Sequence, residues 1–456
     1  MIDHPVLTSF LVALGVRVVF AALSSLLHEG VFIPDEGQYL TLALVASQGG
    51  LTADFWPGYG QSLFDSTRTF MWPLTTLFWL FGPSRLLAQL LPVLFGSVTA
   101  AATAAVAGRV VRRSYALTAG LIVALFPSQV LWSSVVLRES LVWAGLAGIA
   151  ALVSYSNRKS STIKILSSTV VSSLLIVALA SLRIQTAALA LWCLFLALLI
   201  GRGSRVVRVL SAVCFLLVVP WQLGMGPGAV TFAQGSVDRL GSAHAYMSLN
   251  ADSSVLTDSS VLTDSSLDDG DVAFTKGSVD SCAAHVKGKT GEWKGITEGG
   301  GKLLERESGA WLCISDESGG TVLVDNRPRT SLRRVPKGLL DTMIRPLPWK
   351  AGWSNPDRFA AGLELPFWIL LYVFSAYGAW EQREHFRQLI FPALLFGSVA
   401  VSGAMVHGNL GTAFRHRGQV LFAVAILAVG GLQAVADRRK GRQRRRDTID
   451  SVNPEI

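Results

Sequence analysis

The sequence predicts an all-α polytopic membrane protein with about ten transmembrane helices. Three observations favour this fold class: 51% of the 456 residues are apolar, only 16% are charged, and the apolar residues form runs long enough to cross a bilayer. An ordinary soluble domain carries about 25% charged residues. The composition therefore excludes a single soluble domain, a disordered chain and a disulfide-rich secreted module.

The expected spans follow from the apolar runs, because about 20 residues of helix cross a hydrocarbon core about 30 Å thick. The runs cover 6–27, 86–108, 115–132, 139–155, 165–182, 186–201, 208–224, 362–380, 389–406 and 420–436. The segment Phe70 to Gly82 is short and contains Pro73, so we expect a re-entrant or interfacial helix there. Arg17 lies midway along the first run and needs a partner or a water-filled cavity. No carboxylate in the other spans stands out as that partner.

The basic residues predict the orientation of the spans. They concentrate in alternate short loops and in the tail, at Arg109, Arg112, Arg113, Arg158, Lys159, Lys164, Arg202, Arg205, Arg208, Arg383, Arg387 and in 438–446. The positive-inside rule places these segments, and with them both termini, in the cytoplasm. The formal charge of +9 therefore records orientation and does not indicate a nucleic-acid partner.

This topology divides the chain into four parts. They are an N-terminal transmembrane module 1–224 with an outer loop 28–85, an extracytoplasmic domain 225–361, C-terminal transmembrane helices 362–436 and a basic cytoplasmic tail 437–456. The tail fits a solvated or headgroup-facing stop-transfer segment.

The outer segment 225–361 is predicted to be a small mixed α/β domain. The repeat DSSVLT at 252–266 has little to pack and indicates a flexible insertion. Trp311 to Ser315 and Thr321 to Val324 flank a turn-like sequence and predict a β-hairpin. Pro336 to Trp349 indicates an amphipathic interfacial helix. Cys282 and Cys313 are a candidate disulfide pair, because the spacing permits the bond and the compartment allows oxidation.

Asp35 and Glu36 are the sharpest candidates for chemistry, because paired carboxylates directly follow the first span. A structural interpretation makes Asp35 an N-cap and Glu36 an acid that favours the helix dipole. A functional interpretation makes the pair a general base at the membrane surface. The same two carboxylates could instead bind a divalent cation such as Mg²⁺ or Mn²⁺.

Several segments, in this order, resemble glycosyltransferases of the GT-C superfamily, the class that includes protein O-mannosyltransferases and lipid A aminoarabinose transferases. The likeness covers the first half of the chain and about the last fifty residues, and it has no counterpart at 225–335. It is carried by Asp35-Glu36 with Tyr39, TFMWPLTTLFWLFGPSRLLAQLLPVLFGSVTAA at 69–101, ALFPSQVLWSSVVLRESLVWAGLAGIAAL at 124–152, GNLGTAFRHRGQVLFAVAIL at 408–427 and PLPW at 346–349.

The resemblance implies a GT-C-like fold and a transferase that takes a sugar from a polyprenyl-phosphate donor. The acceptor would be a glycan, lipid or protein outside the membrane, and membrane lipids would surround the enzyme. Asp35 would deprotonate the acceptor hydroxyl, helped by Glu36. Arginines on the outer side would hold the phosphate, with Tyr39 and His416 beside them: Arg85, Arg138, Arg183, Arg415 and Arg417. Each arginine can also be read as an interfacial anchor.

Two other functions remain open from the sequence: a transporter or flippase of polyprenyl-linked glycans, and a non-catalytic membrane assembly partner. A flippase should place charge along a path through the membrane, where Arg17 is the clear mid-span charge. The sequence has no HExxH and no GxxxxGK[ST] pattern, so nucleotide-driven pumping lacks support.

Overall fold

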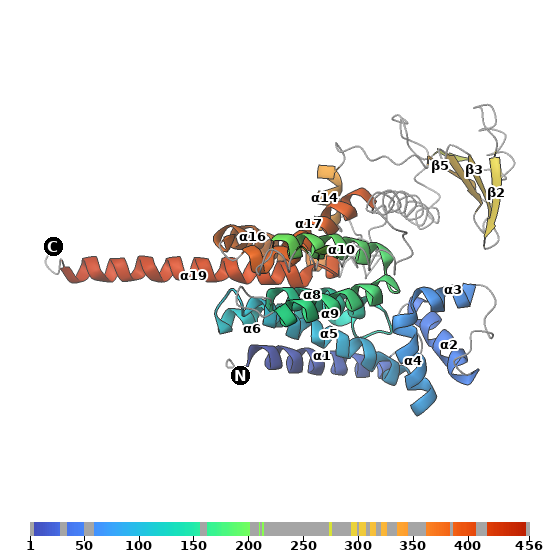
Figure 1. Cartoon of the computed structure of the whole chain (residues 1–456), viewed down its shortest axis with the longest axis horizontal. Helices are drawn as coiled ribbons and strands as arrows, with labels where there is room; N and C mark the ends of the chain where they lie inside the picture. The colour runs from blue at the N-terminus through green and yellow to red at the C-terminus, as the bar shows by residue number, and fades with distance from the viewer. Residues whose placement is uncertain are drawn as a thin grey trace. The chain divides into compact units, whose positions relative to one another are not determined.

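The computed structural model describes residues 4–27, 34–49, 59–155, 162–200, 209, 212–213, 273–275, 293–298, 301–306, 311–315, 321–325, 335–344, 362–383, 386–406 and 417–452. They belong to two compact units (Figure 1). The helical unit comprises Met1–Phe232, Met343–Ala400 and Phe414–Ile456, and the loop unit comprises Ala233–Thr342 and Val401–Ala413.

The helical unit contains almost all of the described helices. They are α1 (Pro5–Leu27), α2 (Pro34–Gln48), α3 (Tyr59–Ser66), α4 (Arg68–Phe81), α5 (Arg85–Ala107), α6 (Arg113–Leu125), α7 (Pro127–Trp132), α8 (Glu139–Tyr155), α9 (Thr162–Ala180), α10 (Ile184–Ile200), α16 (Leu365–Glu381), α17 (Phe386–Val406, whose end belongs to the loop unit) and α19 (Leu421–Val452). Most begin and end within a few residues of the predicted runs. The predicted run 208–224 lies almost entirely outside the described residues.

Three of the described helices are long and apolar enough to cross a membrane: α1, α5 and Leu421–Gln443 at the start of α19. Shorter apolar helices accompany them at Arg113–Leu125, Glu139–Tyr155, Leu166–Ala180, Ile184–Ile200 and Gln388–Ala404. The chain is thus mostly helical in its described part, with the apolar helices of a membrane protein.

The predicted single span 115–132 is wrong, because the helix breaks at Phe126. α6 ends at Leu125 and α7 begins at Pro127, with Phe126 in an extended conformation between them. Proline lacks a backbone N–H and disfavours helical backbone in the residue before it. The apolar run therefore forms two helices with a corner between them.

The predicted N-cap at Asp35 is also wrong. α2 begins one residue earlier, at Pro34, so that Asp35 and Glu36 both lie in its first turn. Proline is well suited to that first position because its missing N–H would be unpaired there in any case. The predicted short helix over Phe70 to Gly82 is present as α4, which contains Pro73.

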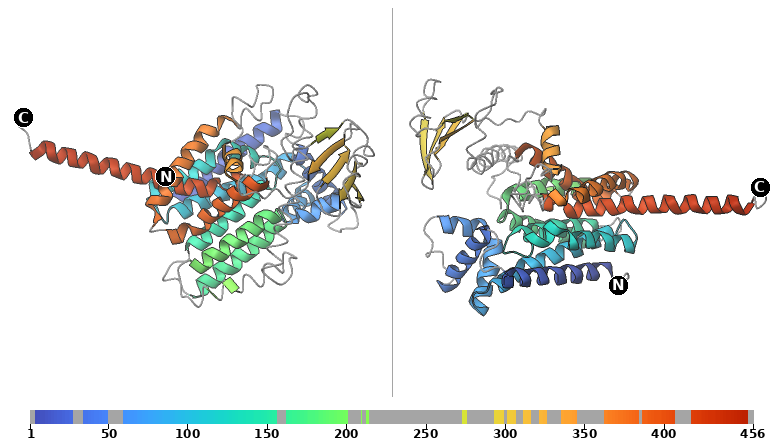
Figure 2. Two further views of the ribbon diagram at one scale, coloured as in Figure 1. Left: turned by 90° about the horizontal axis from the view of Figure 1, so that it is seen from above. Right: turned by 180° about the vertical axis from the view of Figure 1, so that it is seen from behind.

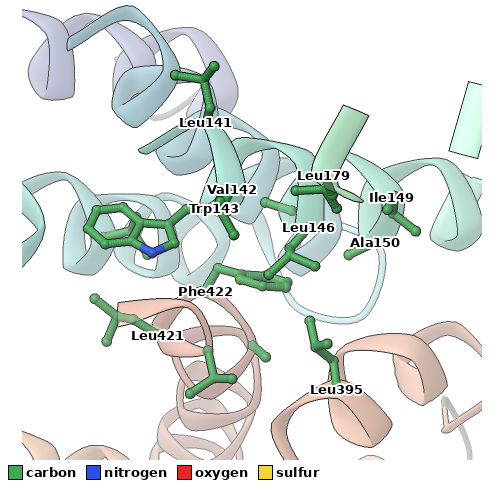
Figure 3. Close-up of a cluster of buried hydrophobic side chains, with 14 of the residues drawn as sticks. Leu141, Val142, Trp143, Leu146, Ile149, Ala150, Leu179, Leu395, Leu421 and Phe422 are labelled. Carbon is green, nitrogen blue, oxygen red and sulfur yellow. The ribbon is translucent and has the colours of Figure 1, made fainter. Parts of the chain in front are cut away.

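The core of the helical unit is centred on α8. Trp143, Leu146 and Ile149 of this helix are buried with Leu179 of α9, Leu395 of α17 and Phe422 of α19 (Figure 3). A helix that is apolar on all sides packs inside a bundle. Most residues of α8 are buried, and its packing fixes the position of its first residue, Glu139.

Glycines allow α16 and α19 to approach each other closely. A Cβ atom on Gly378 would overlap the backbone carbonyl of Leu427, and one on Gly431 would overlap that of Phe374. Small residues at such positions are typical of helix pairs in membranes, where backbone packing replaces the hydrophobic effect.

The two ends of the helical unit carry different contacts. At one end, the Arg109 guanidinium lies 3.4 Å from the centre of the Tyr155 ring, Arg112 pairs with Asp437, and Arg438 pairs with Glu381 at 2.5 Å. We call this the basic end. α2, α3 and α4 gather at the other end, and the second half of α19 extends beyond the basic end (Figures 1 and 2).

The loop unit contains a five-stranded antiparallel sheet in the order β1-β5-β4-β3-β2. Its strands are β1 (Ala273–Thr275), β2 (Trp293–Glu298), β3 (Gly301–Arg306), β4 (Trp311–Ser315) and β5 (Thr321–Asp325). The pairing of β4 with β5 confirms the predicted hairpin. Helix α14 (Val335–Ile344) follows and matches the first part of the predicted interfacial helix, whose remainder at 345–349 lies outside the described residues.

Candidate functional site

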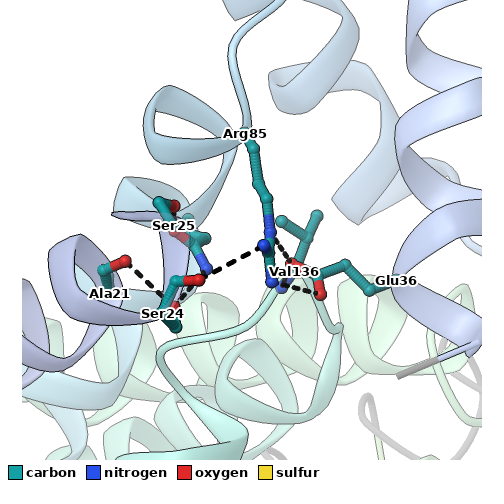
Figure 4. Close-up of polar contacts among 7 residues, drawn as sticks. Ala21, Ser24, Ser25, Glu36, Arg85 and Val136 are labelled. Atoms are coloured by element: carbon teal, nitrogen blue, oxygen red, sulfur yellow. Dashed lines mark hydrogen bonds and ion pairs between the residues drawn. The ribbon is translucent and has the colours of Figure 1, made fainter. Parts of the chain in front are cut away.

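An ion pair between Glu36 and Arg85 holds α2 to the start of α5. Arg85 Nε lies 3.2 Å from Glu36 Oε1 and Arg85 Nη2 lies 3.1 Å from Oε2, so the guanidinium donates to both oxygens (Figure 4). Arg85 Nη1 also donates to the carbonyl of Ser24 near the end of α1, at 3.4 Å. The Glu36 side chain is fully buried, and Glu36 is therefore fixed by its partner.

The backbone of the segment after α7 contacts the same carboxylate. The Val136 N–H donates to Glu36 Oε1 at 3.4 Å. Val136 lies two residues before Arg138, in the non-helical stretch that leads into α8. Glu36 thus connects three parts of the site: α2, the start of α5 and the approach to Arg138.

Tyr39 lies one turn further along α2 and is buried against Phe70 of α4, with the ring centres 5.3 Å apart. Burial is the main cause that raises the pKa of the Tyr39 phenol. Four charges also act on it: Arg138 and Arg183 lower the pKa, while Glu139 and Asp35 raise it. Asp35, Arg138, Glu139 and Arg183 are therefore close enough to the Tyr39 phenol for their charges to act on it.

A second ion pair supports the same site. Arg183, in the turn between α9 and α10, donates from Nη2 to Glu139 Oε1 at 2.5 Å. Ser181 in that turn is hydrogen-bonded to Thr69 of α4. Arg183 is thereby held between the first turn of α8 and the short helices at this end.

The exposure of these groups separates two roles. Asp35, Arg138 and Arg183 are partly exposed, whereas Glu36 and Glu139 are buried. A buried carboxylate that pairs with an arginine stabilises the arrangement, and a partly exposed group can reach a substrate. Glu36 and Glu139 each pair with an arginine and are buried, whereas Asp35, Arg138 and Arg183 keep part of their surface exposed.

One of the two carboxylates considered for a divalent cation is already paired. Both oxygens of Glu36 accept from Arg85, so that carboxylate is occupied. Within the described ranges, no group of three or more His, Cys, Asp or Glu side chains is placed to hold a metal ion.

Arg417 lies in a different cluster from Tyr39. Its guanidinium is 5.6 Å from the centre of the Trp368 ring in α16, and the whole residue is buried. Burial lowers the pKa of Arg417, and the nearby Tyr372 and Glu364 partly offset that effect. The predicted role of Arg417 in holding a phosphate beside Arg138 is not supported by these contacts.

The remaining predicted residues lie outside what the structure describes. Arg415, His416 and Cys282 belong to such segments, and only the backbone of Cys313 is described, in β4. The proposed Cys282–Cys313 disulfide stays a prediction.

Arg17 has partners that the sequence does not reveal. Its Nη1 donates to the carbonyl of Ala124 at 2.9 Å, its Nη2 to that of Val123 at 3.2 Å, and its Nε to Ser133 Oγ at 2.6 Å. These carbonyls end α6, where the break at Pro127 removes the donors that a continuous helix would supply. Arg17 is thus a helix cap and is bonded to backbone rather than to a carboxylate.

Glu364 was missed among the functional candidates, although it lies within the predicted span 362–380. It is buried immediately before α16, and its Oε1 accepts from the Ser128 N–H at 2.5 Å. An acid within an apolar run is itself a signal of function or of a buried partner.

Comparison of the chain with models of protein families, with curated proteins and with solved structures gives no match.

Proposed function

We propose that the chain is a glycosyltransferase that moves a sugar from a polyprenyl-phosphate donor to an acceptor hydroxyl. The single observation that supports this most is that Asp35, Arg138 and the ion-paired Glu139 and Arg183 all act electrostatically on the buried Tyr39. A partly exposed carboxylate beside fixed cations is what base-assisted attack with a departing phosphate requires. The acceptor is a glycan, lipid or protein at the membrane surface.

The proposed topology has about ten spans, with both termini in the cytoplasm and the site outside. The contacts of Arg109, Arg112 and Arg438 support this topology, because they join three predicted cytoplasmic segments at one end of the helical unit. The residues around Tyr39 belong to predicted extracytoplasmic segments. A lipid-linked donor would reach such a site from the outer leaflet.

In the proposed reaction, the acceptor oxygen attacks the anomeric carbon of the donor sugar while Asp35 takes the hydroxyl proton. The bond from that carbon to the phosphate oxygen breaks, and its electron pair leaves with the polyprenyl phosphate. The configuration at the anomeric carbon is inverted because a single displacement occurs. A positioned base contributes about 10²–10⁴-fold to such a step.

Arg138 and Arg183 would stabilise the negative charge that develops on the leaving phosphate. A guanidinium binds phosphate oxygens in pairs and keeps its charge at any working pH. Glu139 holds Arg183 in place, and Glu36 does the same for Arg85. Fixed charges need no reorganisation when the leaving group forms, and this lowers the barrier.

The competing prediction of a flippase finds no support in Arg17. The charge on which a path through the membrane would depend is bonded to Ala124, Val123 and Ser133. A side chain held by these groups, and also by the Ala13 carbonyl at 3.3 Å, is poorly suited to move with a passing headgroup.

The deciding experiment uses Asp35→Asn in purified protein reconstituted into vesicles with a panel of polyprenyl-phosphate hexoses. Release of free polyprenyl phosphate in the presence of a cell-envelope acceptor fraction is the readout. We expect the rate to fall by about 10²–10⁴-fold, because asparagine cannot take the proton. Asp65→Asn in α3 is the matched control, since Asp65 is an exposed carboxylate on a neighbouring short helix. Equal rates for Asp35→Asn and the wild type would reject the catalytic assignment.

Arg138→Gln tests the phosphate contact separately. We expect weaker donor binding, seen as a higher KM for the donor, together with a lower kcat because leaving-group stabilisation is lost. Arg68→Gln is the control, because Arg68 is an exposed arginine at the start of α4. If both arginine variants behave alike, the loss reflects general electrostatics and the assignment of Arg138 fails.

The topology has its own test. Single cysteines introduced in 225–361 should react with a membrane-impermeant maleimide added outside sealed cells. Labelling only after the cytoplasm is opened would reverse the orientation and place the site inside.

A further inference from the structure

The segment from Phe126 to Arg138 connects two buried clusters of the helical unit. Its far end reaches the site, where the Val136 N–H donates to Glu36 and the Arg138 charge acts on Tyr39. Its near end is α7, which lies against residues that precede α16 and α19. Whatever fixes α7 therefore also fixes the approach to Arg138.

The break at Pro127 leaves backbone groups of both signs without helical partners. The carbonyls of Val123 and Ala124 are on one side of it, and the Ser128 N–H is on the other. The Arg17 guanidinium donates to the two carbonyls, and the Glu364 carboxylate accepts from the Ser128 N–H. Each charge also has the sign that suits the dipole of the helix end it meets.

Glu364 is held firmly. It is buried, and Arg417 lies close enough for the two charges to interact. Trp368, one turn further along α16, packs edge-on against Phe126 with the ring centres 5.1 Å apart. A charge-assisted hydrogen bond and an aromatic contact therefore fasten α7 to α16 at neighbouring points.

A further hydrogen bond connects α7 to the start of α19. Gln129 Nε2 donates to the Gly418 carbonyl at 2.9 Å. A Cβ on Gly418 would lie 2.9 Å from Cζ2 of Trp143, so Gly418 also fits closely against α8. Glu364 before α16 and Gly418 before α19 thus form the surface on which α7 packs.

We propose that Glu364 is a positioning residue for Arg138, acting through Ser128 and the segment 127–138. It touches neither substrate, and it fixes the distance between Arg138 and the Asp35 carboxylate by anchoring the helix that leads to Arg138. This role rests on the proposed transferase function of the site. It makes the C-terminal helices necessary for a site whose charged residues all come from the first 183 residues.

The test compares Glu364→Ala with Glu364→Gln in reconstituted protein. Glutamine keeps an oxygen that accepts from Ser128, whereas alanine removes it. We expect the alanine variant to raise the KM for the polyprenyl-phosphate donor by roughly 10-fold to 100-fold, since a displacement of about 1 Å has effects of this order. The KM for the acceptor should stay unchanged, and the glutamine variant should recover most of the loss.

Two controls separate positioning from general damage. Glu381→Ala removes the acid at the far end of α16, which pairs with Arg438 at the basic end, and should leave both KM values unchanged. In an Arg138→Gln background, Glu364→Ala should add little, because the group that it positions is already gone. Equal increases in both KM values, or additive effects with Arg138→Gln, would overturn the proposal. If Glu364→Ala does not fold, Glu364→Asp moves the acceptor by one methylene and permits the same comparison.

Hydrogen exchange measures the positioning without any transfer reaction. Glu364→Ala should speed the exchange of backbone amides at 128–138 and leave α5 unchanged, while Glu364→Gln should resemble the wild type. Unchanged exchange at 128–138 would reject the positioning role even if the protein is a transferase. Faster exchange in a protein that transfers no sugar would instead keep the anchor and reject the proposed function.

Discussion

The two ends of the helical unit use the same kinds of residue in different ways. At the basic end, Arg438 and Glu381 form an ion pair whose side chains are 61% and 25% exposed. At the site end, Arg85 and Glu36 form one whose side chains are 17% and 0% exposed. Water can solvate Arg438 or Glu381 if their ion pair breaks, so that pair contributes little to stability. Water cannot reach Glu36, so loss of Arg85 would leave a buried charge without a partner.

The difference separates ion pairs that are buried in the fold from ion pairs that lie in contact with water. At the site end, Glu36 and Glu139 are occupied by Arg85 and Arg183, and the partly exposed groups stand out against them. At the basic end, Arg112 and Arg438 pair with Asp437 and Glu381, and all four side chains are at least partly exposed. The following changes test this contrast, beginning with the one expected to have the largest effect.

Glu36→Ala should lower the free energy of unfolding by about 3–5 kcal/mol, because it leaves the Arg85 charge without its buried partner. Denaturation of purified protein in mixed micelles measures the loss. The double variant Glu36→Ala with Arg85→Met should recover part of it, because no buried charge then remains unpaired. A loss below about 1 kcal/mol would mean that water reaches this pair and that the contrast between the ends is false.

Arg17→Met should also destabilise the protein, by about 1–3 kcal/mol for each carbonyl that loses its donor. The carbonyls are those of Val123 and Ala124 at the end of α6. Pro127→Ala is the informative companion, because alanine restores the N–H that the Val123 carbonyl would meet in a continuous helix. Arg17→Met should therefore be less harmful in the Pro127→Ala background. Equal losses in the two backgrounds would show that Arg17 does not act as a cap.

Gly418→Ala should lower stability by about 1–3 kcal/mol through overpacking. The added Cβ would lie 2.9 Å from Trp143 Cζ2 and 3.0 Å from Gln129 Nε2, so both side chains must move. Gly397→Ala in α17 is the control, because its Cβ would meet nothing within 4 Å. Similar unfolding curves for the two variants would show that Gly418, Trp143 and Gln129 are loosely packed.

Hydropathy predicted most of the helices because it responds to the length of apolar runs. It failed at 115–132 because Phe126 and Pro127 interrupt the backbone without interrupting the apolar run. The sequence could not predict the partners of Arg17 for a related reason. They are carbonyl groups, which every residue has, so no residue type in the sequence marks them.

The sequence marks part of this cluster of charges. Asp35, Arg138 and Arg183 were candidates because charge is rare outside the predicted cytoplasmic loops, and the structure brings all three near Tyr39. Which carboxylate is buried depends on packing, so the sequence could not separate Glu36 from Asp35. The role of Glu364 depends on its hydrogen bond with Ser128, which lies 236 positions away in the chain. Local sequence patterns do not reveal such a contact.

The smallest expected effect is at the basic end, where Arg438→Gln should change the free energy of unfolding by less than about 1 kcal/mol. Its ion pair with Glu381 is exposed, so the effect should shrink further between 0.1 M and 1 M salt, as the Debye length falls from about 10 Å to about 3 Å. Arg438 also lies 5.3 Å from the centre of the Tyr377 ring, and this contact should contribute a small stabilisation that salt does not remove. The same salt series on Glu36→Ala should show almost no change, because ions do not enter a buried pair. If salt weakened both variants equally, the site end would be as wet as the basic end, and the buried anchors around Asp35 and Arg138 would lose their explanation.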